Sequence, residues 1–437
     1  MSERRMRRRL LGWLGKHIPE LELDEVADPR KARGRRWRLG TLLRTVVVAM
    51  VCGARSLRET ESQTAQWSPQ QRGPLGLGRR RVPDTTLRDL VCAMTPQALR
   101  PVLYRIVRAA HRRKALEPEQ LPFGVCAIDG KSTAIDVADA RYAQKQSHSN
   151  GTGEYGLVRT LTACLTSSRA AVCLDAAPIP AWTNEMGHFE VALGQLCRAY
   201  KGLNLFSLIT ADAGMCSEHN AQKVLDHGLH YLFALKLTQP TIFAEAQRWL
   251  GSQTEPLAIT EDVVGPHTVR RQLFLTEQMS GWEWKHLRTT LRVVCEKTDR
   301  RTGQLVEMVD ARTGGLTTQI ERYFISSLPA AKLTAKQWLR VVREHWGVEN
   351  SCHFNWDVMF QEDARPWVRA SGKGALVAMM LRRIAYNLVT LFRSVTQRSE
   401  EKHHVPWMDL IRAFYRALMI GEQQLVPADA LILVISP

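Results

Sequence analysis

The segment between residues 123 and 236 alternates between strand and helix patterns, and this alternation restricts the chain to a few architectures. Three runs rich in apolar and β-branched residues come first, at 123–129, 157–165 and 170–179. A helical pattern follows at 184–200, with Asn184 placed as its N-cap, and then come a strand, a second helix capped by Ser217 and a further strand. This order is typical of an α/β fold in which helices cover a sheet.

The regions on either side of this core have different patterns. The preceding segment predicts small helices joined by tight turns, which suit a helix-turn-helix-like DNA-binding domain and equally suit any helical bundle. After the core, short alternating runs predict a β-rich insertion, and two long apolar helices follow it. The expected domains are a basic N-terminal arm (1–40), a helical, DNA-binding domain (41–120), the first part of the core (121–240), the β-rich insertion (241–328), the second part of the core with the helix that carries Glu349 (329–400) and a C-terminal helical cap (401–437).

The charge of the chain narrows the class of its partners. Sixty Lys and Arg residues against 43 Asp and Glu residues give a net charge of +17. Such an excess favours a polyanion, because phosphate contacts release counterions, and nucleic acid is the first expectation. A membrane surface and simple solubility are the alternatives. Arginines concentrate near the N-terminus, and we expect Arg35, Arg36 and Arg38 to contact DNA, although a charge run can also be a solvated arm.

The cysteines and apolar stretches indicate a soluble protein of the cytoplasm. The nine cysteines include no C-x-x-C pair, and most lie in apolar runs, as reduced core cysteines do. The apolar stretch after "MSERRMRRR" is too short for a signal peptide and no cleavage site follows it. The run "TLLRTVVVAMVCGA" contains Arg44 and is too short to cross a bilayer. We therefore expect no membrane association.

Three acidic residues stand at unusual positions. Asp129 ends the first strand and is followed by Gly130, which permits a turn, and Asp212 ends the strand at 203–212 in the same way. Glu349 falls on the apolar stripe of a helix predicted over 334–358. An ionised carboxylate in such a place costs several kcal/mol unless it is paired or metal-bound. An ordinary turn aspartate and an ordinary ion pair, for example between Glu349 and a neighbouring Arg or His, are the alternatives.

A convergence of these acids would create a metal site. If the two strands lie side by side and the helix packs across them, the three carboxylates repel one another unless divalent cations lie among them. Oxygen ligands suit Mg²⁺ or Mn²⁺. Two such ions about 3.5–4 Å apart activate a nucleophile and stabilise the leaving oxygen in phosphoryl transfer. In a chain of net charge +17, this arrangement points to a DNA phosphodiester as the substrate.

Side chains near the acids allow two interpretations each. Lys131 and Arg343 could hold phosphates, and surface solvation or an ion pair to the acids is the alternative. Trp346 and Trp356 could stack on a flipped base, but core packing is favoured at positions on the apolar stripe.

Five sequence blocks occur in an order that is known from one family. They are "AIDGKS" (127–132), "TNEM" (183–186), "TADAGMCSEHNAQKVLDHGLHYLFALKLTQP" (210–240), "YFISSL" (323–328) and "REHWGVENSCHFNWDVMFQEDA" (343–364). The series resembles that of bacterial insertion-sequence DDE transposases, and is most similar to the group of H-repeat-associated proteins. The helical stretch at 40–103 resembles the domain that precedes the catalytic core in that group, but more loosely.

The resemblance implies a ribonuclease-H-like core with a β-rich insertion. It also implies that Asp129, Asp212 and Glu349 form the catalytic triad and hold two Mg²⁺ ions, for which Mn²⁺ can substitute. Many relatives have Arg four residues before the catalytic Glu and Lys seven residues after it, where this chain has His345 and Trp356. His345 is therefore expected beside the DNA with Lys131 and Arg343, and the roles of His345 and Trp356 stay open.

The function implied is that of a DNA transposase with endonuclease and strand-transfer activity. It would bind double-stranded DNA, both the terminal inverted repeats of its element and the target, as a homodimer or larger multimer in the bacterial nucleoid. Two alternatives remain. One is a metal-dependent DNA nuclease on the same core, and the other is a non-catalytic DNA-binding protein derived from a transposase.

Overall fold

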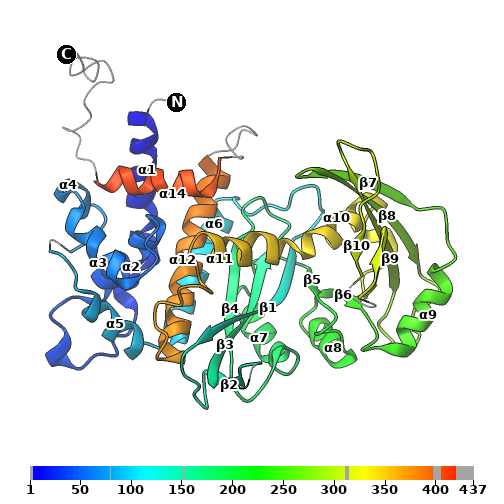
Figure 1. Cartoon of the computed structure of the whole chain (residues 1–437), viewed down its shortest axis with the longest axis horizontal. Coiled ribbons are helices and arrows are strands. Elements are labelled where there is room, and N and C mark those ends of the chain that lie inside the picture. The colour runs from blue at the N-terminus through cyan, green and yellow to red at the C-terminus, as the bar shows by residue number, and fades with distance from the viewer. Residues whose placement is uncertain are drawn as a thin grey trace.

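A computed structural model of the 437-residue chain describes residues 3–78, 80–149, 151, 153–310, 314–396 and 405–419. A group of helices forms one end of the molecule, and a sheet runs from its centre to the other end (Figure 1). The chain is thus a mixed α/β protein with one large sheet, as the alternating pattern predicts.

The sheet has ten strands in the order β2-β3-β1-β5-β6-β12-β9-β8-β7, and β4 pairs with β3 beside this path. Only β1 with β5 and β5 with β6 are parallel among its pairs in the described residues. The strands are β1 (Val125–Ile135), β2 (Ala143–Ser147), β3 (Glu154–Leu165), β4 (Cys173–Ile179), β5 (Leu208–Ala211), β6 (His230–Leu235), β7 (Ala258–Val264), β8 (His267–Thr276), β9 (Thr289–Asp299) and β12 (Gln319–Ser326). A separate pair is β10 (Met308–Val309) with β11 (Leu316–Thr317).

The predicted insertion is β-rich, and its strands extend the core sheet. β12 pairs with β6 of the core on one side and with β9 on the other, and β8 and β7 follow. Helix α9 (Pro240–Leu250) packs on β8 and β9. The insertion is therefore connected to the core by continuous strand pairing.

The helical end is larger and better packed than the sequence predicted. It contains α1 (Glu3–His17), α2 (Leu39–Val51), α3 (Leu57–Gln66), α4 (Pro69–Arg72), α5 (Asp84–Ala93), α6 (Arg100–Arg112), α12 (Gly372–Thr396) and α14 (Trp407–Met419). Short 3₁₀ turns are η1 (Pro19–Leu21), η2 (Leu23–Glu25), η3 (Ala32–Gly34), η4 (Pro96–Ala98) and, before the last core segment, η5 (Ala330–Lys332). Residues 420–437 of the expected C-terminal cap lie outside the described residues.

The expectation of a basic arm over 1–40 is wrong for residues 3–17, because they fold as helix α1 with a buried face. Leu10 and Leu14 of α1 are buried, and the buried Arg7 donates from Nε to the carbonyl oxygen of Ala417 in α14. The arginine pattern suggested a solvated segment, but one leucine face of α1 packs against the rest of the domain.

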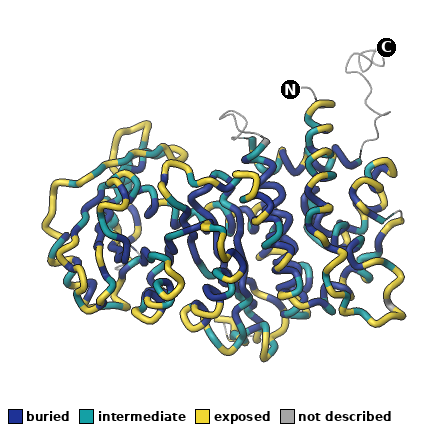
Figure 2. Tube along the Cα trace, turned by 180° about the vertical axis from the view of Figure 1, so that it is seen from behind, coloured by how far each residue is buried: buried dark blue, intermediate teal, exposed yellow. Residues whose placement is uncertain are grey.

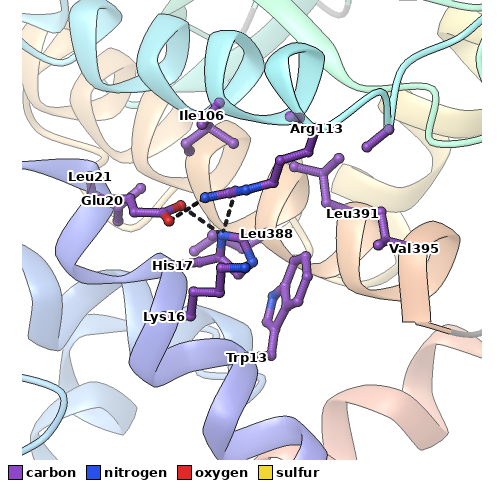
Figure 3. Close-up of a pocket in the computed structure, with 13 residues that line it drawn as sticks. Trp13, Lys16, His17, Glu20, Leu21, Ile106, Arg113, Leu388, Leu391 and Val395 are labelled. Atoms are coloured by element: carbon purple, nitrogen blue, oxygen red, sulfur yellow. Dashed lines mark hydrogen bonds and ion pairs between the residues drawn. The ribbon is translucent and has the colours of Figure 1, made fainter.

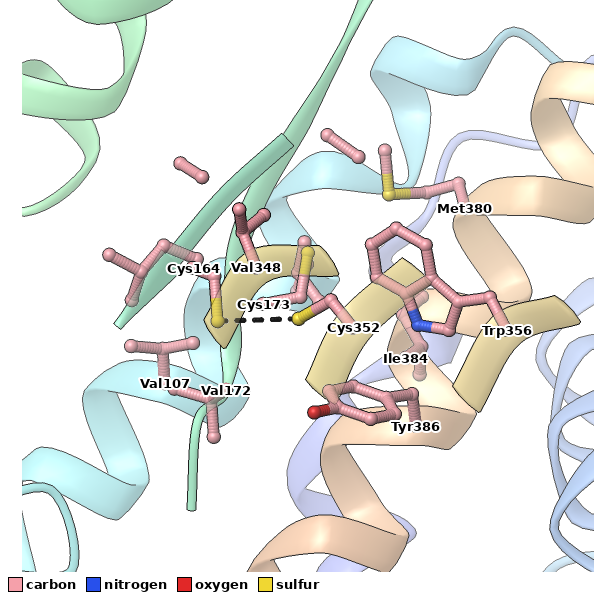
Figure 4. Close-up of a cluster of buried hydrophobic side chains, with 14 of the residues drawn as sticks. Val107, Cys164, Val172, Cys173, Val348, Cys352, Trp356, Met380, Ile384 and Tyr386 are labelled. Atoms are coloured by element: carbon pink, nitrogen blue, oxygen red, sulfur yellow. Dashed lines mark hydrogen bonds between the residues drawn. The ribbon is translucent and has the colours of Figure 1, made fainter. Parts of the chain in front are cut away.

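Helix α12 is the central helix of this domain. Its stretch Gly372–Val395 has the length and apolar composition of a membrane-spanning helix, but the most apolar part of this stretch is buried inside the protein. Figure 2 shows the corresponding dark core. Met380, Ile384 and Tyr386 of α12 meet side chains of the sheet in the cluster shown in Figure 4. The burial indicates a core helix.

The remaining helices cover the sheet near the candidate site. They are α7 (Glu185–Ala199), α8 (Glu218–Asp226), α10 (Ala335–His345), the π-helical turn η6 (Val348–His353) and α11 (Phe354–Val358). The predicted caps of α7 and α8 are confirmed, since the Asn184 side chain accepts from the Gly187 amide and the Ser217 side chain from the Asn220 amide.

Candidate active site

Asp129 and Asp212 lie on neighbouring parallel strands. The last residue pair between β1 and β5 is Ile128 with Ala211, so the two aspartates follow at the same level of the sheet. There β5 ends, whereas β1 continues to Ile135. The sheet therefore opens on one side of β1 from Asp129 onward, and we call this gap the sheet opening. The predicted turn at Gly130 is wrong, because β1 runs straight through it.

Glu349 reaches the same region from the π-helical turn η6. Val348 and Cys352 of η6 are buried, and the Cys352 thiol lies 3.3 Å from that of Cys164 on β3 (Figure 4). A Cβ on Gly347 would lie 3.0 Å from the Thr166 methyl carbon, so the backbone comes close to the sheet here. These contacts hold η6 over β1 and β3.

The predicted burial of Glu349 is wrong, since the residue is exposed and its neighbour Val348 is buried. Helix α10 ends at His345, and η6 then has the wider hydrogen-bond spacing of a π-helix. Both changes rotate the later residues relative to α10. In a uniform helix over 334–358, the apolar face would have included Glu349. The carboxylate of Glu349 instead faces the sheet opening and Asp212. Desolvation, and after it the charge of Asp212, raises the pKa of Glu349.

The three predicted acids lie near enough for their charges to act on one another. Burial and then the charges of Glu349 and Asp212 raise the pKa of Asp129 to about 7, although the Gly130 amide donates to its carboxylate. Among the described residues, none of the three carboxylates forms an ion pair with Lys or Arg. His353 Nδ1 lies 3.5 Å from Asp129 Oδ2, and burial lowers the pKa of His353 to about 3. The imidazole is therefore neutral near pH 7 and adds no positive charge, whereas the charge of Arg322 opposes the rise in the pKa of Glu349.

The donor set fits a hard divalent cation. Within the described ranges, no three His, Cys, Asp or Glu side chains are close enough to form a ready-made metal site. The acids nevertheless offer only carboxylate oxygens, which Mg²⁺ and Mn²⁺ prefer, and a cation among them would relieve the repulsion that raises the pKa of Asp129.

A fourth carboxylate, Glu185, lies at the sheet opening and was not predicted. It is the first residue of α7, and its charge contributes to the raised pKa of Asp129. Desolvation and then the charge of Asp212 raise the pKa of Glu185 itself, and Arg159 opposes them. The sequence block "TNEM" contains this residue, but the spacing alone gave no reason to connect it with Asp129.

Two of the residues expected beside the DNA are already engaged. The buried Lys131 ammonium lies 2.9 Å from Asp357 and 3.1 Å from Asp363, so a phosphate would have to displace a carboxylate. His345 is buried, and its Nδ1 lies 3.1 Å from Thr210 Oγ1. Desolvation lowers the pKa of His345 to about 4. The ring packs under the end of β5, and contact of His345 with DNA stays a prediction.

The other expected DNA contacts lie on the surface. Arg343 is exposed and lies 2.7 Å from Asp262 of β7, and Arg35, Arg36 and Arg38 are exposed at the helical end. Trp356 is a core residue, fully buried with the Arg383 guanidinium 3.7 Å from its ring centre. Trp346 is partly buried, and Arg322 lies over its ring. Core packing, the favoured alternative, is thus confirmed for Trp356.

A cavity of about 90 Å³ lies away from the acids, among α1, α6 and α12. Figure 3 shows Arg113 reaching His17 and Glu20 at its rim. No acid of the candidate site lines it. The cavity belongs to the packing of the helical end.

Comparison with known proteins connects this geometry to one family. The family described as "Transposase DDE domain" matches residues 122–388, and a domain described as associated with it matches residues 21–107. The matched ranges contain the sheet, the insertion and all four acids, and most of the helical end.

Similar proteins are found in Escherichia coli. The K12 protein YhhI, whose name assigns it to the H repeat-associated transposases, is 29% identical over 208 residues, covering 45% of this chain and 51% of YhhI. The K12 protein YbfL is 28% identical over the same length, with the same coverage. The chain thus spans about half the length of the curated relatives it matches. A solved synaptic complex of piggyBac transposase with hairpin DNA covers 99% of this chain and 83% of the solved chain at 13% identity, but its TM-score of 0.41 is too low to support an argument.

Proposed function

The chain belongs to the Transposase DDE domain family, and we propose that it is a DNA transposase of an insertion sequence. It would bind the inverted repeats at the ends of its element, hydrolyse a phosphodiester at each end and join the 3′-hydroxyl to target DNA. The observation that carries this proposal is the group Asp129, Asp212 and Glu349 at the sheet opening, whose carboxylates form no ion pair with Lys or Arg in the described residues.

The strand order supports a ribonuclease-H-like core. Three antiparallel strands, β4, β3 and β1, continue into two parallel strands, β5 and β6, and α7 connects the two sets. The first acid lies within the central strand and the second directly after its parallel neighbour.

The acids have separate duties in the proposed reaction. Asp129 and Asp212 would hold metal between them, because they lie at one level of the sheet, and Glu349 would complete the site from η6. Two bound Mg²⁺ ions would supply an activated nucleophile and neutralise charge on the leaving oxygen. His353 lies behind Asp129 and restricts the orientation of its carboxylate.

Binding of DNA would rest on the basic surface. Arg35, Arg36 and Arg38 are exposed at the helical end, and Arg343 is exposed beside η6. One arginine guanidinium group can donate two hydrogen bonds to the oxygens of a phosphate. Such contacts supply affinity without base specificity. Work on two DNA ends requires at least a dimer on DNA, in the cytoplasm beside the nucleoid.

The test uses the purified chain, DNA that carries the element ends, and a target plasmid. We expect Mg²⁺-dependent cleavage and joining that are lost in Asp129→Asn, Asp212→Asn and Glu349→Gln. The control is Glu255→Gln, since Glu255 is exposed in the insertion far along the chain from these acids. Cleavage without joining under all conditions would leave a nuclease, and DNA binding with neither activity would leave a binding protein.

A further inference from the structure

The carboxylate of Glu185 lies directly against the backbone of Gly130. A Cβ at position 130 would lie 1.8 Å from Glu185 Oε1 and 2.6 Å from Oε2, which is far inside contact distance. A side chain at position 130 would therefore displace the Glu185 carboxylate from this position, in a strand that does not turn. The absence of a side chain next to Asp129 is what admits Glu185.

Glu185 and Glu349 approach β1 from opposite faces of the sheet. Neighbouring residues of a strand point to opposite faces, so the side of Gly130 that meets Glu185 is opposite to the side of Asp129 that meets His353 of η6. In a continuous sheet the strand next to β1 would separate the two faces. Here β5 has ended, and Asp212 interacts with both Glu185 and Glu349.

The surroundings of Glu185 give it no other partner. The residue is half-buried, and within the described part of the chain its carboxylate has no hydrogen bond and no ion pair. The nearby Arg159 guanidinium donates to the Thr183 carbonyl oxygen instead. An acid in the first turn of a helix is favourable for the helix dipole, but that effect does not require contact with Gly130.

We propose that Glu185 is a fourth carboxylate of the candidate active site, which binds the same divalent cation as Asp129 and Asp212 from the α7 face of the sheet. This inference rests on the proposed function. It gives Gly130 a defined role, which is to leave the space through which Glu185 reaches the cation.

The test measures cation affinity directly, without DNA. Mn²⁺ is titrated into the full chain, and free Mn²⁺ is followed by electron paramagnetic resonance. We expect Glu185→Gln to weaken Mn²⁺ binding by about tenfold or more, because one ligand charge is removed. The matched control is Glu218→Gln, since Glu218 is likewise the first residue of a capped helix, α8, and should leave the affinity unchanged.

A second variant tests the contact itself. Gly130→Ala should weaken Mn²⁺ binding as much as Glu185→Gln, because the new methyl group displaces the carboxylate. The double variant should be no weaker than either single variant, as expected for residues that act as a unit. Ser132→Ala, an exposed position on the same face of β1, is the control. Circular dichroism establishes that each variant is folded, and Glu185→Gln carries the test alone if Gly130→Ala does not fold.

The outcomes separate this inference from the proposed function. Loss of Mn²⁺ binding in Asp129→Asn with full binding in Glu185→Gln would overturn the role of Glu185 and leave the transposase proposal intact. Unchanged binding in Asp129→Asn and Asp212→Asn would overturn both. Additive losses in the Gly130 and Glu185 double variant would contradict the shared mechanism.

Discussion

Two groups of carboxylates lie along strand β1 and in the segment after Glu349, and they differ in whether Lys or Arg pairs with them. At the sheet opening, Asp129, Asp212, Glu185 and Glu349 form no ion pair with Lys or Arg in the described residues, and the pKa values of Asp129, Glu185 and Glu349 are raised. Two residues along β1, the Lys131 ammonium pairs with Asp357 and Asp363. We call these the open group and the paired group.

The paired group continues into the core. Glu362 is fully buried between Arg382 and Arg383 of α12. Desolvation raises the pKa of Glu362, but the charges of the two arginines outweigh it, and the pKa is lowered. Glu362 is thus more buried than any acid of the open group. The comparison teaches that burial does not identify a candidate site for metal, whereas missing countercharge does.

The largest effect is expected from neutralising the open group. Asp129→Asn should reduce DNA cleavage by about 10⁴-fold, equivalent to about 5.5 kcal/mol of activation free energy, because a ligand of the proposed metal site is lost. Folding should be unimpaired, since the variant also removes like-charge repulsion. Single-turnover cleavage assays and thermal melts measure the two quantities. Unfolding of the variant would mean that Asp129, like the acids of the paired group, contributes to stability.

The paired group should respond in the opposite way. Arg383→Met should lower the free energy of unfolding by about 3–5 kcal/mol, because Glu362 is left buried with an incomplete countercharge. Urea denaturation measures this loss. Arg412→Met is the control, as Arg412 makes an exposed pair with Asp409 and should cost at most about 1 kcal/mol. Equal losses in the two variants would contradict the distinction.

A smaller effect is expected where the two groups adjoin on β1. Lys131→Met should destabilise the protein by about 2 kcal/mol, because charge-assisted hydrogen bonds to Asp357 and Asp363 are lost. DNA affinity at fixed salt should hardly change, since the ammonium is buried and already paired. A filter-binding assay checks this, and a large loss of affinity would restore Lys131 to the DNA contacts.

The smallest effect is the pH dependence of stability without metal. The pKa of Asp129 is raised to about 7, so the folded state keeps a proton that the unfolded state releases near pH 4. Stability from this group is therefore present at low pH and lost as pH rises toward about 7.

His345 and His353 act in the other direction, because their lowered pKa values reduce stability as pH falls below about 6.5. The informative quantity is the melting temperature of Asp129→Asn minus that of the wild type in EDTA. It should increase by a few degrees between about pH 5 and about pH 8. A constant difference would mean that Asp129 is not charged at the higher pH.

The sequence predicts the positions of the two strand-end acids because runs of apolar residues mark the strands clearly. Asp129 and Asp212 follow apolar runs, and strand pairing then places them side by side. Glu349 was identified for the wrong reason, because its predicted place on the buried face assumed a regular α-helix. The π-helical turn turns this residue away from the buried face, and the spacing of the apolar residues does not reveal that turn. Its identity came from the resemblance to a family, and its exposure from the structure.

Other features depend on contacts that a linear pattern does not contain. Glu185 and Gly130 are 55 positions apart, and only the fold brings a carboxylate against that glycine. His345 is buried because β5 ends over it, and α1 is packed because the distant helix α14 covers it. These residues required the tertiary structure, whereas caps such as Asn184 and Ser217 are local and were predicted.

The pairing of β6 with β12 has a consequence for how such a chain changes in length. Leu235 and Tyr323 are partners, so the polypeptide leaves the core and returns to it at adjacent strands. Segments inserted or removed between these two points need not alter the positions of Asp212 before them and Glu349 after them. The insertion is therefore a module whose size evolution or an engineer can vary while the distance between the acids stays fixed.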